Sequence, residues 1–270
     1  MVMWLFLTAC DSVGPSAPKA PSPCASTEFA AAGHDEVPTC LPCLADLPAS
    51  LLDGGNAHAD RVIVVYKRQK LTALYEHGAL AQCTRVELGD WPYEPKVQQD
   101  GESTPEGWYS VATKRTSAAY DWFPATVFTE ALHVSYPNAA DVDRAVAQGV
   151  VTPEVASRLR EQIGRGELPD QETKMGGQIL LHDWNPGVPT AGCVGLPAEE
   201  MHALFTRAVE GDPVLILPWR TVLYNDGSTA EAAIPPRPPP SFMPSSMIDR
   251  ERSRPGRMVL NPIEITADGP

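Results

Sequence analysis

Short apolar runs separated by polar turns mark where ordered structure begins, near residue 59. Residues 61–67 (RVIVVYK) and 71–76 (LTALYE) are rich in apolar and β-branched residues and flank the polar turn 68–70, which predicts a hairpin. Residues 83–88 (CTRVEL) alternate between inward and outward positions, which predicts a third strand. Three successive strands indicate an antiparallel sheet.

The rest of this region predicts short strands and helices. Strand-like runs occur at residues 107–112, 131–136, 179–181 and 213–217, and helices are expected at residues 141–148, 152–163 and 197–209. The second helix begins with an N-cap Thr152 and a first-turn Pro153, and the third is amphipathic with acidic residues in its first turn. The pattern predicts a mainly β fold with a few packed helices, in the α+β class.

Composition divides the chain into a central domain and two proline-rich ends. Proline is abundant, with 28 residues, and is concentrated in residues 15–48 and 234–244. We therefore expect a Pro/Ala-rich tether over 10–58, one folded domain over 59–220 and a flexible tail over 221–270. The net charge of −13 argues against nucleic acid as a partner, because phosphate binding needs clustered Lys and Arg.

The first residues indicate export. Residues 1–9 (MVMWLFLTA) are apolar but too short to span a bilayer, and they end in Leu7-Thr8-Ala9-Cys10. This ending resembles the lipobox of bacterial lipoproteins, which implies a lipid on Cys10 and a membrane partner. No Lys or Arg precedes the apolar run, so we interpret it as the end of a signal peptide that starts further upstream. The alternative is an ordinary cleaved signal with Cys10 incidental; both place the mature chain in the cell envelope, on the periplasmic face of a membrane or free in the periplasm.

The remaining cysteines fit an oxidising compartment. Cys24, Cys40, Cys43 and Cys83 are even in number, so disulfides are expected, and four thiols allow three connectivities. The sequence does not choose among them. Cys40 and Cys43 have the spacing of zinc ligands, but no second pair follows at a suitable distance, so no metal is expected.

Gly192-Cys193 and His182 are the candidate catalytic residues. Cys193 is expected in the turn before the helix at 197–209, where free N–H groups and the helix dipole would favour a thiolate. His182 follows the buried run 179–181 and would act as the general base and acid. Gly192 leaves room beside the nucleophile, and its backbone N–H is expected in an oxyanion hole. The alternative makes Cys193 a disulfide partner or a buried apolar residue.

Several segments, taken in order, resemble the L,D-transpeptidase catalytic domain, a cysteine-dependent family that acts on bacterial cell-wall peptides. They are residues 100–110 (DGESTPEGWYS), 132–138 (LHVSYPN) followed by Asp141, 177–182 (GQILLH) and 191–194 (AGCV). The resemblance covers roughly residues 60–219. It implies a β-sandwich or barrel of the L,D-transpeptidase type, peptidoglycan stem peptides as partners and no cofactor. It also implies substrate contacts from Thr190, Ala191, Tyr136 and Trp184.

The resemblance implies an acyl-enzyme reaction. The Cys193 thiolate would attack the carbonyl of diaminopimelate at position three of a tetrapeptide stem, and D-alanine would leave. A second stem peptide, a protein lysine or water would then resolve the thioester. The alternatives are a non-catalytic wall-binding lipoprotein, a structural lipoprotein in which Cys193 forms a disulfide, and an L,D-carboxypeptidase or amidase that releases wall-anchored protein.

The chain departs from the family's common pattern beside the nucleophile. Ala191 stands where a histidine is usual and Gly195 where a basic or amide residue is usual, which weakens the expected grip on the acyl donor. Ten residues separate His182 from Cys193, a short loop for the family. Adjacent side chains point apart in an extended chain, so we expect a backbone carbonyl rather than the Asp183 carboxylate to orient His182. The other histidines are expected to be solvated or structural: His34, His58, His77, His133 and His202.

Overall fold

The computed structural model describes residues 35–52, 58–116, 128–225 and 227–237. The predicted signal peptide, Cys10, Cys24 and His34 lie outside these residues. Within the described ranges, no helix combines the length and the apolar character needed to cross a membrane.

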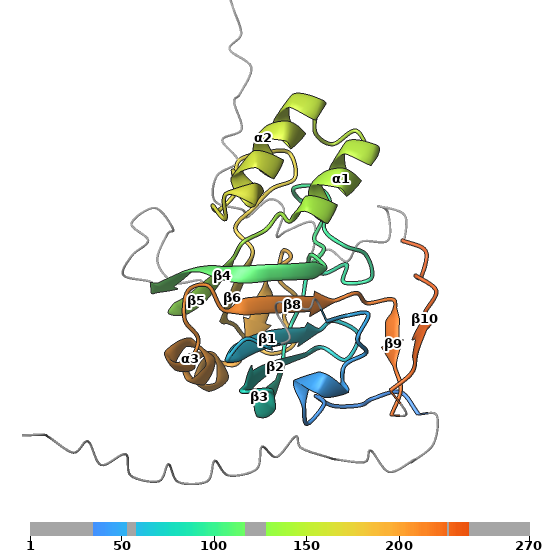
Figure 1. The fold of residues 1–270 in the computed structure, drawn as a ribbon, viewed down its shortest axis with the longest axis vertical. Helices are drawn as coiled ribbons and strands as arrows, with labels where there is room; N and C mark the ends of the chain where they lie inside the picture. The colour runs from blue at the N-terminus through green and yellow to red at the C-terminus, as the bar shows by residue number, and fades with distance from the viewer. Residues whose placement is uncertain (1–34, 53–57, 117–127, 226, 238–270) are drawn as a thin grey trace, which may run out of the picture.

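The strands and helices follow one another as the sequence pattern predicts, with the addition of β7, β9 and β10 (Figure 1). The strands are β1 (Arg61–Tyr66), β2 (Leu71–Glu76), β3 (Ala79–Arg85), β4 (Gly107–Thr116), β5 (Glu130–Val134), β6 (Leu180–Asp183), β7 (Val194–Leu196), β8 (Pro213–Leu217), β9 (Thr221–Leu223) and β10 (Thr229–Glu231). The helices are α1 (Ala139–Ala147), α2 (Pro153–Gly164) and α3 (Ala198–Arg207), with a 3-10 turn η1 at Leu44–Asp46.

Eight strands form one sheet in the order β3-β2-β1-β8-β4-β5-β6-β7, and β9 pairs with β10 separately. Two neighbouring pairs are parallel, β1 with β8 and β6 with β7, and the other pairs are antiparallel. The far edges meet through bridges between Glu87 and Gly195 and between Gly89 and Thr190, so the sheet nearly closes on itself. This confirms the predicted fold class, a mainly β domain with a few packed helices.

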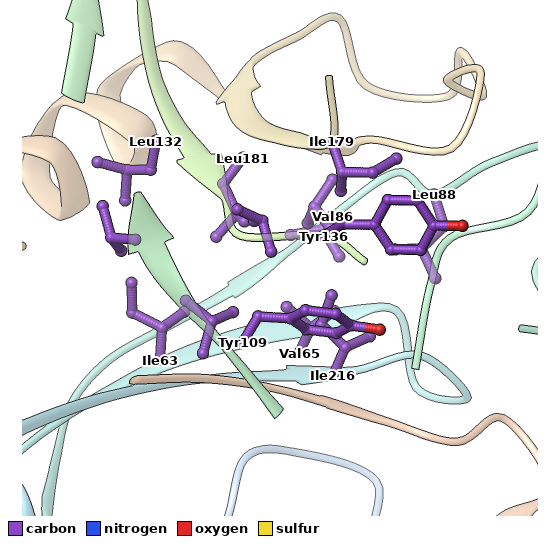
Figure 2. Close-up of a cluster of buried hydrophobic side chains, with 14 of the residues drawn as sticks. Ile63, Val65, Val86, Leu88, Tyr109, Leu132, Tyr136, Ile179, Leu181 and Ile216 are labelled. Carbon is purple, nitrogen blue, oxygen red and sulfur yellow. The ribbon is translucent and has the colours of Figure 1, made fainter. Parts of the chain in front are cut away.

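The main hydrophobic core fills the inside of this curved sheet. Figure 2 shows Ile63, Val65 and Ile216 on one side facing Leu132, Leu181 and Ile179 on the other. Helix α3 closes the core beside β5 and β6 and adds Met201 and Leu204, both almost fully buried. Helices α1 and α2 pack against each other at one end of the domain (Figure 1).

Local sequence signals explain where α1 and α2 begin. The Thr152 hydroxyl accepts a hydrogen bond from the Val155 N–H, and Pro153 occupies the first turn, as predicted. Helix α1 starts earlier than expected because Asn138 caps it: the Asn138 side chain accepts from the Asp141 N–H, and Asp141 Oδ2 accepts from the Asn138 N–H.

The predicted strand at 83–88 is shifted in the structure. Strand β3 ends at Arg85, and residues 86–89 instead cross to the opposite edge of the sheet. Only Val86 and Leu88 of this segment point into the main core, so the alternation is real but belongs to the closing segment. The strands β7, β9 and β10 were not predicted, and two of them lie within the expected flexible tail.

Residues 35–52, which the sequence analysis assigned to the tether, belong to the packed domain. Four apolar side chains of this segment are buried against the outer face of β1 and β2: Val37, Leu41, Leu44 and Leu47. A disulfide between Cys40 and Cys83 fixes the segment to β3, and Cys43 is disulfide-bonded as well. The Val37 N–H donates to the Leu223 carbonyl at 2.8 Å, so the start of the expected tail is ordered too. These residues carry no helical or strand periodicity, which explains why composition alone misassigned them.

A buried lysine ties β1 to the segment that approaches the candidate site. The Lys67 ammonium donates to the carbonyl oxygens of Glu94 and Thr104 at 3.1 and 2.8 Å and to Glu106 Oε1 at 2.6 Å. The Lys67 side chain is 0% exposed, and burial lowers its pKa to about 8. All three donors of the ammonium are used, so the lysine anchors three points of residues 94–106.

We expect Lys67→Met to lower the free energy of unfolding by about 3–5 kcal/mol, because it leaves the Glu106 carboxylate and two carbonyl groups without their cation in a buried place. Lys70→Met is the matched control, since Lys70 pairs with Glu87 at 3.6 Å with half of its side chain exposed, and it should cost less than about 1 kcal/mol. Urea denaturation of both variants measures the difference. Equal losses would contradict the anchoring role of Lys67.

Candidate active site

Pairing of β6 with β7 brings His182 and Cys193 to one face of the sheet. The parallel register places Leu181 opposite Val194 and His182 opposite Gly195. Leu181 and Val194 both point into the main core. Because side chains alternate along a strand, His182 and Cys193 both point to the opposite, outer face. The structure therefore places the two residues that the sequence singled out on the same face of the sheet.

A small apolar cluster forms the floor of this outer face. Phe128, Ala131 and Leu180 are buried there, and the half-buried Cys193 packs against them. The Phe128 ring also lies against the His182 imidazole, with 5.4 Å between the ring centroids. Phe128 was not predicted from the sequence because it belongs to no periodic run. The cluster removes water from one side of both candidate catalytic groups.

The backbone fixes the His182 ring. His182 Nδ1 lies 2.9 Å from the Asp183 carbonyl oxygen, which confirms the expectation that a backbone carbonyl is the orienting group. Nδ1 therefore carries the proton toward this acceptor and Nε2 keeps its lone pair. The Asp183 carboxylate instead accepts from the N–H groups of Thr129 and Glu130 at 2.6 and 2.8 Å. Burial lowers the pKa of His182, so the imidazole is neutral and able to accept a proton.

Trp184 covers the place where a side chain on Gly195 would lie. A Cβ built on Gly195 would be 2.7 Å from Trp184 Cβ and 2.9 Å from two atoms of the indole. The indole stands edge-on to His182 at 5.3 Å and donates from Nε1 to the Val188 carbonyl at 2.6 Å. Gly195, two residues after the cysteine, thus leaves the space that Trp184 occupies, and Trp184 covers the second side of the imidazole.

The turn that presents Cys193 is built around Thr190. The Thr190 hydroxyl donates to the Cys193 carbonyl at 2.7 Å and accepts from the Gly192 N–H at 3.2 Å. Gly192 has a φ of +121°, and a Cβ there would lie 2.8 Å from the Ser103 carbonyl oxygen. Ala191 is exposed at the tip of the turn.

Two of the predicted substrate contacts are corrected by this geometry. Thr190 is buried, and its hydroxyl is used inside the turn, so it shapes the turn instead of facing a substrate. Tyr136 is fully buried in the main core beside Tyr109 (Figure 2), with 6.3 Å between the two ring centroids, and it presents no surface to the outer face. Trp184 and the exposed Ala191 do adjoin the candidate catalytic residues.

The predicted oxyanion donor, the Gly192 backbone N–H, already has a hydrogen-bond partner. The Gly192 N–H points to Thr190 within the turn, so it would have to exchange this hydroxyl for a substrate oxygen.

The Cys193 thiol rests in a protonated state. Its Sγ donates to the Gln178 carbonyl oxygen at 3.5 Å, and it is the free cysteine among the described residues. Burial raises the pKa of the thiol, opposed by a backbone hydrogen bond with Leu180 and by the charge of Lys96. The expected helix effect is absent, because β7 intervenes and α3 begins only at Ala198.

The other described histidines are solvated or structural, as expected. His58, His77 and His202 are exposed. His133 is fully buried on β5, where it contacts Arg115 and Gln171.

Comparison with known proteins identifies the family. The family model of the YkuD L,D-transpeptidase catalytic domain matches residues 59–216. The chain belongs to this family of L,D-transpeptidases. A comparison with curated proteins gave no match to the chain.

Solved structures are similar to the chain at low sequence identity. Bd1075 of Bdellovibrio bacteriovorus is 22% identical, with 67% of this chain and 57% of that chain covered and a TM-score of 0.42. A mutant L,D-transpeptidase of Enterococcus faecium is 17% identical, with 60% and 51% covered and a TM-score of 0.36. An L,D-transpeptidase of Mycobacterium tuberculosis H37Rv is 14% identical, with 58% and 57% covered and a TM-score of 0.34. The chain thus spans between 51% and 57% of the length of these proteins.

Alkylation of Cys193 should depend on pH in a way that reflects its buried, hydrogen-bonded thiol. Only the thiolate reacts, and its pKa is raised, so the rate with iodoacetamide should still be increasing at about pH 9, beyond the ordinary thiol midpoint of about 8.5. Intact-mass kinetics from about pH 6 to pH 10 measure this profile. A plateau reached below about pH 8 would show that the resting site holds a thiolate.

Proposed function

We propose that the chain is a peptidoglycan L,D-transpeptidase in which Cys193 is the nucleophile and His182 the general base and acid. The observation that carries this proposal is the common face of β6 and β7, from which both side chains project with the His182 ring already oriented by Asp183. Membership of the L,D-transpeptidase family supports peptidoglycan stem peptides as the substrate class.

The neutral pair explains how the reaction begins. His182 Nε2 takes the proton of the Cys193 thiol as sulfur attacks the carbonyl carbon of diaminopimelate at position three of a tetrapeptide stem. The C–N bond to D-alanine then breaks, and the imidazolium gives its proton to the leaving amine. A thioester remains on Cys193. General acid–base catalysis of this kind contributes about 10²–10⁴-fold to a rate.

Resolution of the thioester defines the activity. An amine of a second stem peptide gives a cross-link, a protein lysine gives an anchored protein, and water gives a shortened stem. In each case His182 removes a proton from the attacking group, and sulfur leaves and regains its proton. We propose an amine acceptor, with an L,D-carboxypeptidase or an amidase that releases wall-anchored protein as the hydrolytic alternatives.

The apolar surroundings of the pair favour the acyl-enzyme chemistry. Phe128 and Trp184 lie on two sides of the His182 imidazole, at 5.4 and 5.3 Å between ring centroids. Exclusion of water strengthens the hydrogen bonds and charges that develop during attack and protects the thioester from hydrolysis.

Two other features of the site favour an alternative function. The raised pKa of Cys193 and the absence of a basic side chain at Gly195 would suit a non-catalytic protein that binds wall peptides on the same face. Products distinguish the two functions, since a binder leaves the muropeptides unchanged.

We expect Cys193→Ala to reduce turnover of disaccharide-tetrapeptide muropeptides by about 10³-fold or more, because Cys193 is the free thiol of the described residues and a thioester needs a thiol. Cys193→Ser should be nearly as severe, because a hydroxyl does not ionise near neutral pH. Mass analysis of the products measures the loss and also shows whether dimers or shortened stems are formed. Circular dichroism should show that both variants are folded, and retained turnover in the alanine variant would exclude Cys193 as the nucleophile.

We also propose that the protein is anchored by lipid on Cys10 and acts in the cell envelope. The Leu7-Thr8-Ala9-Cys10 motif supports this, and the Pro- and Ala-rich residues that follow, up to the ordered segment at 35–52, provide a spacer.

Cys10→Ser should remove the protein from the membrane fraction, because the thiol that accepts the lipid is absent. Fractionation and intact-mass analysis measure the change, with Ser12→Ala as the control. Wild-type protein found entirely in the soluble periplasmic fraction would contradict the lipid anchor and leave only export.

A further inference from the structure

Four polar residues form a closed hydrogen-bonded ring on the outer face of the sheet, through three side chains and both the side chain and the backbone N–H of Gln178, and none of them has a role in the reaction described above. Arg115 on β4 donates from Nη2 to His133 Nδ1 at 2.8 Å and from Nη1 to Gln178 Oε1 at 3.4 Å. Gln171 Oε1 lies 3.2 Å from His133 Nε2 and accepts from the Gln178 backbone N–H at 2.8 Å. The ring thus connects Arg115, His133, Gln171 and Gln178, and we call it the Arg115 ring.

The donors and acceptors of the Arg115 ring are fixed. A guanidinium only donates, so His133 Nδ1 is the acceptor and Nε2–H donates to Gln171. The Gln171 amide cannot flip, because its nitrogen donates to the carbonyl oxygens of Tyr136 and Pro169 at 2.8 and 2.6 Å. Burial and the charge of Arg115 lower the pKa of His133 to about 4, so the ring keeps one hydrogen-bonding pattern at neutral pH.

Glycine allows the Arg115 ring to close around Gln178. A Cβ built on Gly177 would lie 2.6 Å from Gln171 Oε1 and 2.8 Å from Gln171 Cα. Any other residue at 177 would therefore push Gln171 away from the Gln178 N–H.

Gln178 connects the Arg115 ring to the nucleophile. Its φ of +54° lies in the left-handed region, which a non-glycine residue adopts only when its surroundings hold it there. Gln171 holds its N–H, Arg115 holds its side-chain oxygen, and its carbonyl oxygen accepts the hydrogen bond from Cys193 Sγ at 3.5 Å. A carbonyl acceptor favours the protonated thiol over the thiolate.

We propose that the Arg115 ring positions the catalytic cysteine: through the Gln178 carbonyl it holds the Cys193 thiol protonated and pointed in one direction until a substrate arrives. This inference rests on the proposed function in that it takes Cys193 as the nucleophile. Arg115, His133, Gln171 and Gln178 are positioning residues, since only Gln178 contacts the reacting sulfur, and it does so in the resting state.

The test opens the ring at two places. Gln178→Gly removes the side-chain oxygen but tolerates the left-handed φ, and Arg115→Met removes the guanidinium. Each variant should shift the pH profile of Cys193 alkylation by iodoacetamide to lower pH by about 0.5 unit or more, because a loosened carbonyl no longer favours the thiol. Each should also lower kcat with tetrapeptide muropeptides about tenfold with little change in KM, because the sulfur is less well aligned.

The double variant separates positioning from general loosening. If both residues act through the same carbonyl, Gln178→Gly with Arg115→Met should shift the profile no further than either change alone. Arg61→Met is the matched control. Arg61, on β1, is another partly buried arginine and pairs with Asp212 at 2.9 Å, and its loss should leave the pH profile of Cys193 alkylation unchanged.

Two results would overturn the proposal: single-variant profiles that superimpose on the wild type, or a double variant whose shift equals the sum of the two. If Arg115→Met does not fold, Gln178→Gly decides alone, because glycine relieves the backbone at this position. Alkylation needs no substrate, so failure of the positioning role is distinguishable from failure of the proposed reaction, which the turnover of Cys193→Ala reports.

Discussion

Glu87 and Gly195 exchange two backbone hydrogen bonds, each 2.8 Å long, and the position of the candidate nucleophile depends on them. Strand β7 has only three residues, too few to be held firmly by β6 alone. The segment after β3 pairs with its other side and also accepts the Thr190 N–H on the Leu88 carbonyl at 2.9 Å. Both ends of the turn that carries Cys193 are therefore fixed to one segment of backbone. The hydrogen bonds that close the sheet also hold the candidate nucleophile in place.

Much of the fold was predictable because its elements carry strong local patterns. β1 and β2 are continuous apolar runs around a polar turn, and α2 has a threonine cap followed by proline, so one short window identified each of them. β7 could not be predicted, since Val194–Leu196 is too short to show a period. Residues 35–52 were misassigned for a different reason: their burial depends on the Cys40–Cys83 disulfide and on the outer face of β1, which no local pattern reveals.

The candidate site was predictable only where a reactive residue can be identified from its immediate sequence neighbours. His182 at the end of a buried run and the Gly192-Cys193 pair could be found in this way, and alternation along the strand correctly predicted that a carbonyl would orient His182. The roles of Thr190, Tyr136 and Gln178 depend on partners distant in the sequence or on the curvature of the chain. A threonine that faces into its own turn and a tyrosine that faces into the core have the same sequence context as residues that face a substrate.

The contact between Trp184 and Gly195 makes the side chains allowed at the two positions depend on each other. A side chain at 195 would first meet the Cβ of Trp184, an atom that every residue except glycine has. The backbone N–H of Trp184 is already fixed to the Leu196 carbonyl at 2.7 Å. Positions 184 and 195 cannot both carry side chains unless β6 and β7 move apart. A basic residue at 195 therefore needs either a different residue at 184 or a wider separation of β6 and β7.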